Sequence, residues 1–274
     1  MMRFLTTSLL AALSMLTNAA AHDSAATATY LSNEGIMVAR GNTKILFDAF
    51  YANSYGQYAL LSDEVSAAMM EGKAPYDGID AIFVSHVHGD HFTPAPAIAY
   101  MRAQPDVRLY GSKQVYDAIL DAGIAGDDPL LARIKGYDLS PEDEAISFKV
   151  DGLTVDVVAI PHAGGMSDIQ NFAWRVTLDG ETTVMHLGDA GPVREDFERH
   201  ESHFAAKKTH AAFPPYWFFG HDVGEAILND IIKADMATGI HVPARAARNG
   251  NAWRAEAGGD LFTDPGETRE IGGH

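Results

Sequence analysis

The chain has 274 residues and carries 37 Asp and Glu against 20 Lys and Arg, a formal net charge of −17. Such an acidic surface repels phosphate backbones, so the composition argues against a nucleic-acid partner. The sequence contains no cysteine, which excludes disulfides, thiol nucleophiles and cysteine-held metals. Any transition metal must therefore be bound by His and carboxylate side chains.

The first 21 residues have the pattern of a secretory signal peptide. Arg3 gives a positive start, Phe4 to Leu16 is an apolar run, and Ala19 to Ala21 are small residues at the cleavage positions. The apolar run is shorter than the roughly 20 residues that span a bilayer, so cleavage is favoured over a retained anchor. We expect a periplasmic or secreted protein, with no membrane insertion after cleavage.

Residues 22–243 are expected to form one domain, which opens with strands and helices in alternation. The expected strands are Ala28–Leu31, Gly35–Arg40, Lys44–Ala49, Ile79–Ser85 and Val107–Tyr110. The expected helices are a segment capped by Ser62 and running through Met70, a segment around Pro94–Arg102, and a segment from Ser112 to about Leu120. This rhythm favours a layered α/β architecture.

The middle of the chain favours hairpins. Asp151-Gly152 separates runs 145–149 and 153–160, and Asp179-Gly180 separates runs 172–178 and 182–187. A helix at about 223–234 and a strand ending at Ile240 are expected next. Residues 244–274 are rich in Gly and charge, and we expect them to form a poorly packed tail.

His86, His88, Asp90 and His91 follow directly after the apolar run 79–85. A loop leaving a strand can turn these side chains inward together, so one short segment can hold two metals. We expect His86 and His88 on the first metal, with Asp90 and His91 on the second, and Asp90 also accepting or relaying a proton. Imidazole and carboxylate suit zinc first, with manganese or iron as alternatives. The competing interpretation is a His-rich surface loop.

The pattern His-x-His-x-Asp-His resembles the signature of the metallo-β-lactamase superfamily. The resemblance implies an α/β fold, a four-layer αββα sandwich of two mixed sheets flanked by helices, with two divalent metals at one sheet edge. It also implies three ligands farther along the chain. They are His162 on the first metal, Asp189 as the bridge and His241 on the second metal, each at the end of an expected strand.

Two segments are similar to the branch that contains L-ascorbate-6-phosphate lactonase-like proteins. They are Ile45–Asp48 and the stretch from Ala159 to Gly191. Ala190 departs from that branch, which usually has Thr or Ser after the bridging carboxylate.

Four further residues are candidates for supporting the metals or contacting substrate. Asp48 is expected to bond a ligand imidazole or the loop that holds the metal cluster, or else to cap a turn. His186 is expected to orient Asp189 or to be structural. Trp217, within an aromatic run from Tyr216 to Phe219, lines an apolar pocket or packs in the core. His221 follows that run as a polar contact.

The ligand set predicts an exported hydrolase. A water shared by two cations loses its proton near neutral pH, and the hydroxide attacks a small ester, lactone, lactam or phosphodiester. The alternatives are a non-catalytic periplasmic metal-binding module and a di-iron redox protein of the same fold. The expected partner is a small-molecule substrate, and a homo-oligomer is left open.

Overall fold

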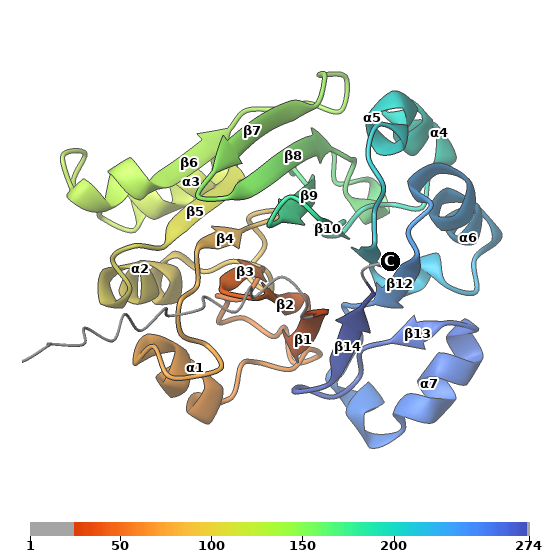
Figure 1. Ribbon diagram of the computed structural model, residues 1–274, viewed down its shortest axis with the longest axis horizontal. Helices are drawn as coiled ribbons and strands as arrows, with labels where there is room; N and C mark the ends of the chain where they lie inside the picture. Colours follow the sequence, from red (N-terminus) through yellow and green to blue (C-terminus); the bar gives the residue numbers. More distant parts are fainter. Residues whose placement is uncertain (1–24, 273–274) are drawn as a thin grey trace, which may run out of the picture.

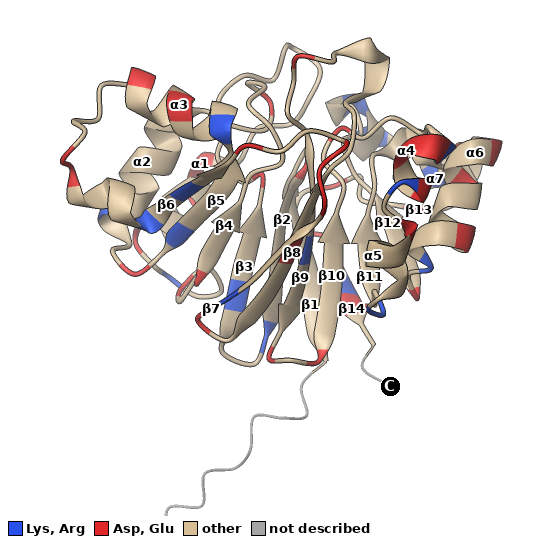
Figure 2. Cartoon of the chain, turned by 90° about the horizontal axis from the view of Figure 1, so that it is seen from above, with Lys and Arg blue, Asp and Glu red and all other residues tan. Residues whose placement is uncertain are grey.

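The computed structural model describes residues 25–272, which form two mixed seven-stranded sheets packed face to face with helices outside them (Figures 1 and 2). This is the four-layer αββα sandwich that the motif implied. The signal-peptide prediction concerns residues 1–21, which lie outside the described part of the chain. No helix within residues 25–272 has the length and apolar character needed to cross a membrane.

The first sheet has the strand order β14-β1-β2-β3-β4-β5-β6. Its strands are β1 (Ala26–Ser32), β2 (Gly35–Arg40), β3 (Thr43–Phe47), β4 (Ala81–Phe83), β5 (Arg108–Ser112), β6 (Ile134–Tyr137) and β14 (Thr268–Ile271). Strands β3 to β6 are parallel neighbours, and β14, β1, β2 and β3 pair antiparallel. The outer face of this sheet carries α1 (Asp63–Met70), α2 (Pro94–Ala103) and α3 (Lys113–Asp121).

The second sheet has the order β13-β12-β11-β10-β9-β8-β7. Its strands are β7 (Ile146–Val150), β8 (Leu153–Ala159), β9 (Phe172–Leu178), β10 (Thr182–His186), β11 (Ala211–Phe213), β12 (Met236–Gly239) and β13 (Asp260–Leu261). Helices α4 (Arg194–Glu198), α5 (Glu201–Ala205), α6 (Asp222–Ala226) and α7 (Gly250–Ala257) lie on its outer side, and a π-helical segment, Ile227–Ile232, continues α6.

The core between the sheets is built from the inward-facing side chains of both. Trp174 of β9 is fully buried there and contacts Phe83 of β4. Its indole N–H donates to the Val84 carbonyl oxygen at 2.9 Å, so the two sheets are joined by a hydrogen bond as well as by apolar contact. That bond lies at the end of β4, immediately before the His cluster, and anchors the loop that carries it.

The two Asp-Gly hairpins form as expected. Asp151 and Asp179 adopt φ angles of 46° and 50°, the left-handed conformation that tight hairpin turns require. The expected strand 79–85 is ordered as a strand only at 81–83, because the chain turns toward the sheet edge from Val84 onward. Strands β6 and β11 were not predicted.

The expectation of a poorly packed tail was wrong. Residues 244–272 contain α7, β13 and β14, and these strands complete both sheets: β13 pairs with β12, and β14 pairs with β1. Leu261 and Ile271 are fully buried. The segment is rich in glycine and charged residues, so its composition gives little sign of two short strands. The few apolar residues of these strands face the core.

Candidate metal centre

The predicted ligands come together at one edge of the sandwich, where several parallel strands end. The loop after β4 carries His86 to His91, and His162 follows β8. Asp189 follows β10, and His241 follows β12. All six ligands other than His88 are at most 8% exposed, so the site is largely removed from water.

The first ligand group consists of His86, His88, His162 and the Oδ2 atom of Asp189. His88 Nδ1 lies 3.1 Å from His86 Nε2 and 3.1 Å from His162 Nε2. Asp189 Oδ2 lies 3.3 Å from His162 Nε2 and 4.0 Å from His86 Nε2. Four ligand atoms therefore surround one point.

The second ligand group consists of Asp90, His91, His241 and the other oxygen of Asp189. Asp189 Oδ1 lies 3.4 Å from His91 Nε2 and 3.3 Å from His241 Nε2. Asp90 Oδ2 lies 3.4 Å from His241 Nε2 and 3.9 Å from His91 Nε2. Since Asp189 gives one oxygen to each group, its carboxylate lies where a bridging ligand belongs.

These spacings fit divalent metals. A tetrahedral zinc with bonds of about 2.0–2.1 Å holds its ligand atoms about 3.3–3.4 Å apart, close to the distances in both groups. Among the described residues, Asp189 Oδ1, His91 Nε2 and His241 Nε2 are buried without a hydrogen-bond partner. Buried polar atoms without partners are rare, so a bound cation explains them better than a structural role.

Hydrogen bonds on the outer edges of the imidazoles fix which nitrogen faces the other ligands. His162 Nδ1 donates to the Ala163 carbonyl oxygen at 2.7 Å, which leaves Nε2 available. The Ser85 hydroxyl donates to Asp48 and accepts from His86 Nδ1 at 3.0 Å, with the same result for His86. Such outer bonds orient ligand imidazoles in metal sites.

Asp48 is the main support of the His cluster. Its Oδ1 accepts from the Ser85 backbone N–H at 2.7 Å, and its Oδ2 accepts from His91 Nδ1 at 2.9 Å. Asp48 is fully buried, with a φ of 38°, so it holds the start of the loop and the His91 ring at once. The structure thus places Asp48 against both the His91 imidazole and the loop of the His cluster, the two contacts expected for it, rather than as a turn cap alone.

His186 is buried, and both of its ring nitrogens form hydrogen bonds with backbone groups. Its Nε2 donates to the Glu34 carbonyl oxygen at 3.0 Å, and its Nδ1 accepts from the Gly188 N–H at 3.1 Å. Gly188 has a φ of 53°, and a Cβ there would lie 2.3 Å from Asn171 Oδ1. The same Asn171 oxygen accepts from the Asp189 N–H at 3.0 Å. His186 and Asn171 therefore set the turn that presents Asp189.

Glu34 was not among the sequence candidates, yet it lies beside the centre. It is fully buried in the turn between β1 and β2, with Oε2 3.5 Å from His91 Nδ1 and 3.6 Å from His186 Nε2. Neither carboxylate oxygen has a hydrogen-bond partner among the described residues. Burial raises the pKa of Glu34 well above its ordinary value, although His91 opposes this.

The two ligand groups differ electrostatically. Burial and the neighbouring imidazoles lower the pKa of His86 and of His88, so both stay neutral as metal ligation requires. Burial also opposes charge on His91 and His241, but the Asp189 and Glu34 carboxylates, together with a hydrogen bond to Asp48 or Asp90, outweigh burial and raise the pKa of both. The second group is a site where positive charge is stabilised, and a cation can take the place of those protons.

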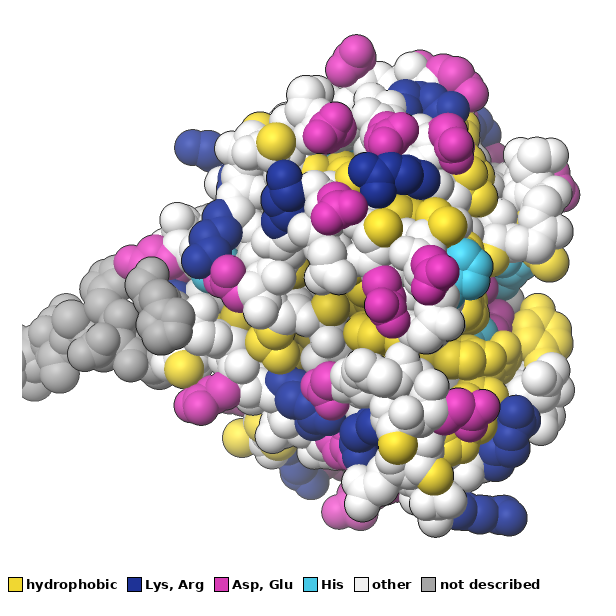
Figure 3. Space-filling view, turned by 90° about the vertical axis from the view of Figure 1, so that its right-hand side faces the viewer, with side chains coloured by type: hydrophobic (Ala, Val, Ile, Leu, Met, Phe, Trp, Pro, Cys, Tyr) yellow, Lys and Arg dark blue, Asp and Glu magenta, His cyan; other side chains and the backbone are white. Residues whose placement is uncertain are grey.

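The opening to the centre is lined by Tyr55, Gln57, Tyr58 and Met166 together with ligand residues. The Tyr58 ring meets the edge of His241 at 4.3 Å between centroids. Tyr55 and Met166 are 54% and 44% exposed, among the most exposed large apolar side chains of residues 25–272. On the right of Figure 3, hydrophobic side chains lie beside exposed histidines. The rim is therefore apolar, whereas the floor is polar.

The side chains of the aromatic run lie in two places, some in the hydrophobic core and some beside the candidate metal centre. Trp217 donates from its indole N–H to the Ala190 carbonyl oxygen at 3.1 Å, and its ring lies 5.2 Å from that of His241. Phe218 is fully buried. His221 does not line the opening; its Nδ1 accepts from the Gly224 N–H and caps α6. The expected polar contact is a helix cap, because His221 is the residue that precedes the first turn.

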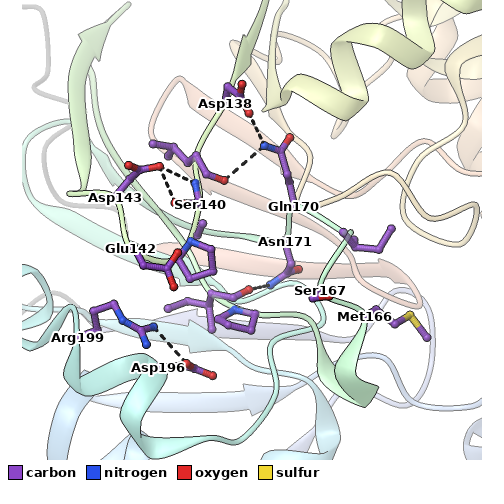
Figure 4. Close-up of a pocket in the computed structure, with 16 residues that line it drawn as sticks. Asp138, Ser140, Glu142, Asp143, Met166, Ser167, Gln170, Asn171, Asp196 and Arg199 are labelled. Atoms are coloured by element: carbon purple, nitrogen blue, oxygen red, sulfur yellow. Dashed lines mark hydrogen bonds and ion pairs between the residues drawn. The ribbon is translucent and has the colours of Figure 1, made fainter.

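A larger cavity of about 600 Å³ adjoins the centre (Figure 4). Met166 lines both this cavity and the opening to the metals. Asp138 accepts from Gln170 at one end, and Asp196 pairs with Arg199 at another. The loop 163–170 therefore separates two adjacent hollows at the same sheet edge.

In a comparison with protein families, residues 43–206 match the model described as Beta-lactamase superfamily domain. No curated protein matches the chain by sequence.

Several solved structures share the fold. Igni18, described as a novel metallo hydrolase from the archaeon Ignicoccus hospitalis, is 16% identical with a TM-score of 0.61, covering 92% of this chain and all of that one (100%). A possible metal-dependent hydrolase from Veillonella parvula is 14% identical with a TM-score of 0.57, covering 90% of this chain and 100% of that one. CmlA, a diiron β-hydroxylase from Streptomyces venezuelae, is 13% identical with a TM-score of 0.52, covering 90% of this chain and 54% of that one. At these identities the likeness shows the fold alone.

Proposed function

Because the chain belongs to the beta-lactamase superfamily, we propose that it is a hydrolase with two divalent metals, acting on a small ester, lactone, lactam or phosphodiester. The observation that carries the proposal is the position of Asp189, whose two oxygens each lie 3.3 Å from a ligand histidine of a different group. A carboxylate so placed suits a centre of two metals better than a single ion.

The metals, when bound, supply Lewis acidity and lower the pKa of water toward neutrality. The chain's own residues supply the rest of the site. Asp90 lines the opening as well as approaching His241, so it can accept or relay a proton at its carboxylate. Burial raises the pKa of Tyr58, so its phenol stays protonated and can donate to an oxygen that gains negative charge.

The finer assignments rest on sequence. The segments Ile45–Asp48 and 159–191 support a lactonase-like substrate, a carbonyl in a small ring. Arg3, the apolar run after it and the small residues 19–21 support export to the periplasm or medium. The apolar rim at Tyr55 and Met166 favours a substrate with an apolar portion over a compact ion.

The test is the metal content of the purified protein, measured by elemental mass spectrometry beside Asp189→Asn. We expect about two metals per chain, falling by at least one in the variant. Asp230→Asn is the matched control, because Asp230 is exposed and pairs only with Arg194 in the described part of the chain. Hydrolysis of a lactone and ester panel is then measured with the metal-loaded proteins.

Other outcomes favour other functions. Iron as the bound metal, with no hydrolysis, would support the di-iron redox alternative, a chemistry named for one protein of this fold. Two metals without activity on any substrate class would support a non-catalytic metal-binding module. Equal metal content in Asp189→Asn and the native chain would contradict the bridging role.

A further inference from the structure

A cavity of about 350 Å³ lies far from the metal centre and gathers positive charge. It is lined by Lys149, Lys207 and Lys208, three of the eight lysines of the chain, together with His210. Three lysines thus share one cavity in a protein whose net charge is −17.

The floor of this cavity is one straight row of side chains across four strands. Lys149 of β7 pairs in register with Thr154 of β8, and Thr154 with Thr177 of β9. Thr177 pairs in turn with Thr183 of β10, and the two hydroxyls are 2.9 Å apart. The Thr183 N–H donates to His210 Nδ1 at 3.0 Å, which places His210 next in the row.

The row is rich in hydrogen-bond donors. Because His210 Nδ1 accepts a hydrogen bond, its Nε2 carries the proton in the neutral ring. The threonine hydroxyls and the lysine ammonium groups add further donors. A donor-lined cavity with cationic side chains is complementary to an oxyanion.

The charge balance of the cavity is positive. Its one carboxylate, Glu181, is paired with Arg40. Lys207 pairs with Asp156 at 3.1 Å and Lys208 with Asp235 at 2.8 Å.

Lys149 differs from the other two lysines. It has no ion-pair partner within residues 25–272, and it stands at the end of the threonine row. Lys208 is 54% exposed and can turn from Asp235 toward a ligand.

The cavity and the metal centre occupy opposite ends of the same strands. Thr154 and Thr183 lie at the starts of β8 and β10, whereas His162 and Asp189 follow the ends of those strands. A ligand of this cavity is therefore not the substrate of the metals.

We propose that the Lys149–His210 cavity binds a phosphate-type oxyanion, as inorganic phosphate or as the phosphate of a small or lipid phosphomonoester. A cavity of this volume accommodates a small organic phosphate, which exceeds a bare ion in size. The net negative charge of the whole chain disfavours long polyanions, so one compact phosphate is the ligand that fits.

The test is calorimetric titration with inorganic phosphate of the native chain and of Lys149→Gln/Lys208→Gln. Phosphate also binds metals, so both titrations are repeated in the Asp189→Asn background, which keeps the cavity intact. We expect saturable binding that weakens as salt rises, and a dissociation constant about tenfold higher in the double variant. Lys73→Gln/Lys113→Gln is the matched control, because both lysines are exposed and lie outside the cavity.

The source of the phosphate is settled by two further measurements. Flotation with phosphatidylcholine vesicles that contain phosphatidic acid, competed by inorganic phosphate and lost in the double variant, identifies a lipid headgroup. Binding of inorganic phosphate with no vesicle binding identifies a free phosphate compound. Thr177→Val removes one hydroxyl without changing charge, and we expect it to weaken binding less than the double variant does.

The proposal is overturned if Asp189→Asn shows no phosphate binding, or if it binds equally with and without Lys149 and Lys208. Because metal content is measured separately, failure here does not touch the proposed hydrolase.

Discussion

The two ends of the second sheet are built from the same strands, but they differ in how many of their buried polar atoms have a hydrogen-bond or ion-pair partner. Nine buried side-chain atoms lack a hydrogen-bond partner within the described residues, and seven of them belong to Asn33, Glu34, His91, Asp189 and His241 at the metal edge. At the far end, Thr209 Oγ1 is the one such atom among the described residues, and Asp156 pairs with both Arg175 and Lys207. Most of the unsatisfied polar atoms thus gather at the candidate metal centre, and this distribution supports the proposed cation site.

Of the changes considered, metal binding at the candidate centre has the largest expected effect on stability. A metal that binds only the folded chain stabilises it by about 4 kcal/mol at a free concentration 1,000 times its Kd. We expect the thermal midpoint to rise on adding zinc and to return to its starting value with a chelator, measured by calorimetry. An unchanged midpoint would mean that the buried ligand atoms at this edge are satisfied without metal.

Asp156→Asn tests how much the buried ion pairs at the far end of the second sheet contribute to stability. Arg175 is 2% exposed, so removing its carboxylate partner leaves a buried charge unpaired and costs about 3 kcal/mol of unfolding free energy. Glu198→Gln is the control, because it breaks an exposed pair with Arg194 and costs at most about 1 kcal/mol. Denaturant titration measures both.

The same carboxylate gives a pH dependence. Burial opposes the charge of Asp156, but Ser147, Lys207 and Arg175 outweigh burial and lower its pKa below the ordinary 3.8. A folded pKa below the unfolded value stabilises the protein above pH 3.8, and this contribution is lost as the pH falls through the folded pKa. The stability difference between the native chain and Asp156→Asn should therefore shrink in acid; a constant difference would show that Asp156 does not titrate with a lowered pKa.

Substitution of one glycine at each end of the second sheet allows a direct comparison of the two ends. Gly188 and Gly180 have φ angles of 53° and 73°, but a Cβ on Gly188 would lie 2.3 Å from Asn171 Oδ1, whereas nothing lies within 4 Å at Gly180. We expect Gly180→Ala to cost about 1 kcal/mol, from backbone strain alone. Gly188→Ala should cost about 2–3 kcal/mol and also lower metal content, because the turn presents Asp189. Equal losses in both variants would refute the packing argument.

Glu34→Gln has the smallest expected effect on stability. The substitution keeps the shape and removes a buried carboxylate that lacks partners, so the metal-free chain should change by less than about 1 kcal/mol. Metal affinity should fall about tenfold, since Glu34 contacts the outer edge of His91. Competition with a colorimetric chelator measures the affinity, and an unchanged value would make Glu34 purely structural.

The sequence predicted the fold and the residues that meet at the candidate metal centre, because a dense His-Asp motif and polar residues at strand ends are local signals. Glu34 and Asn171 were not predicted, since each reaches the centre only through packing between segments far apart in the chain. The strands of residues 260–271 were missed for a similar reason. They are short, and their pairing with β12 and β1 supplies the order that their composition lacks.

The pairing of β14 with β1 also determines on which side of the molecule the two ends of the described chain lie. Ala26 and Ile271 are register partners, at the end of β1 remote from the turn that carries Glu34. Both ends of the described chain thus leave from the side opposite the metal opening. A carrier, a bead or a surface attached through either end leaves the opening facing the surrounding solution, and an immobilised form should keep its access to substrate.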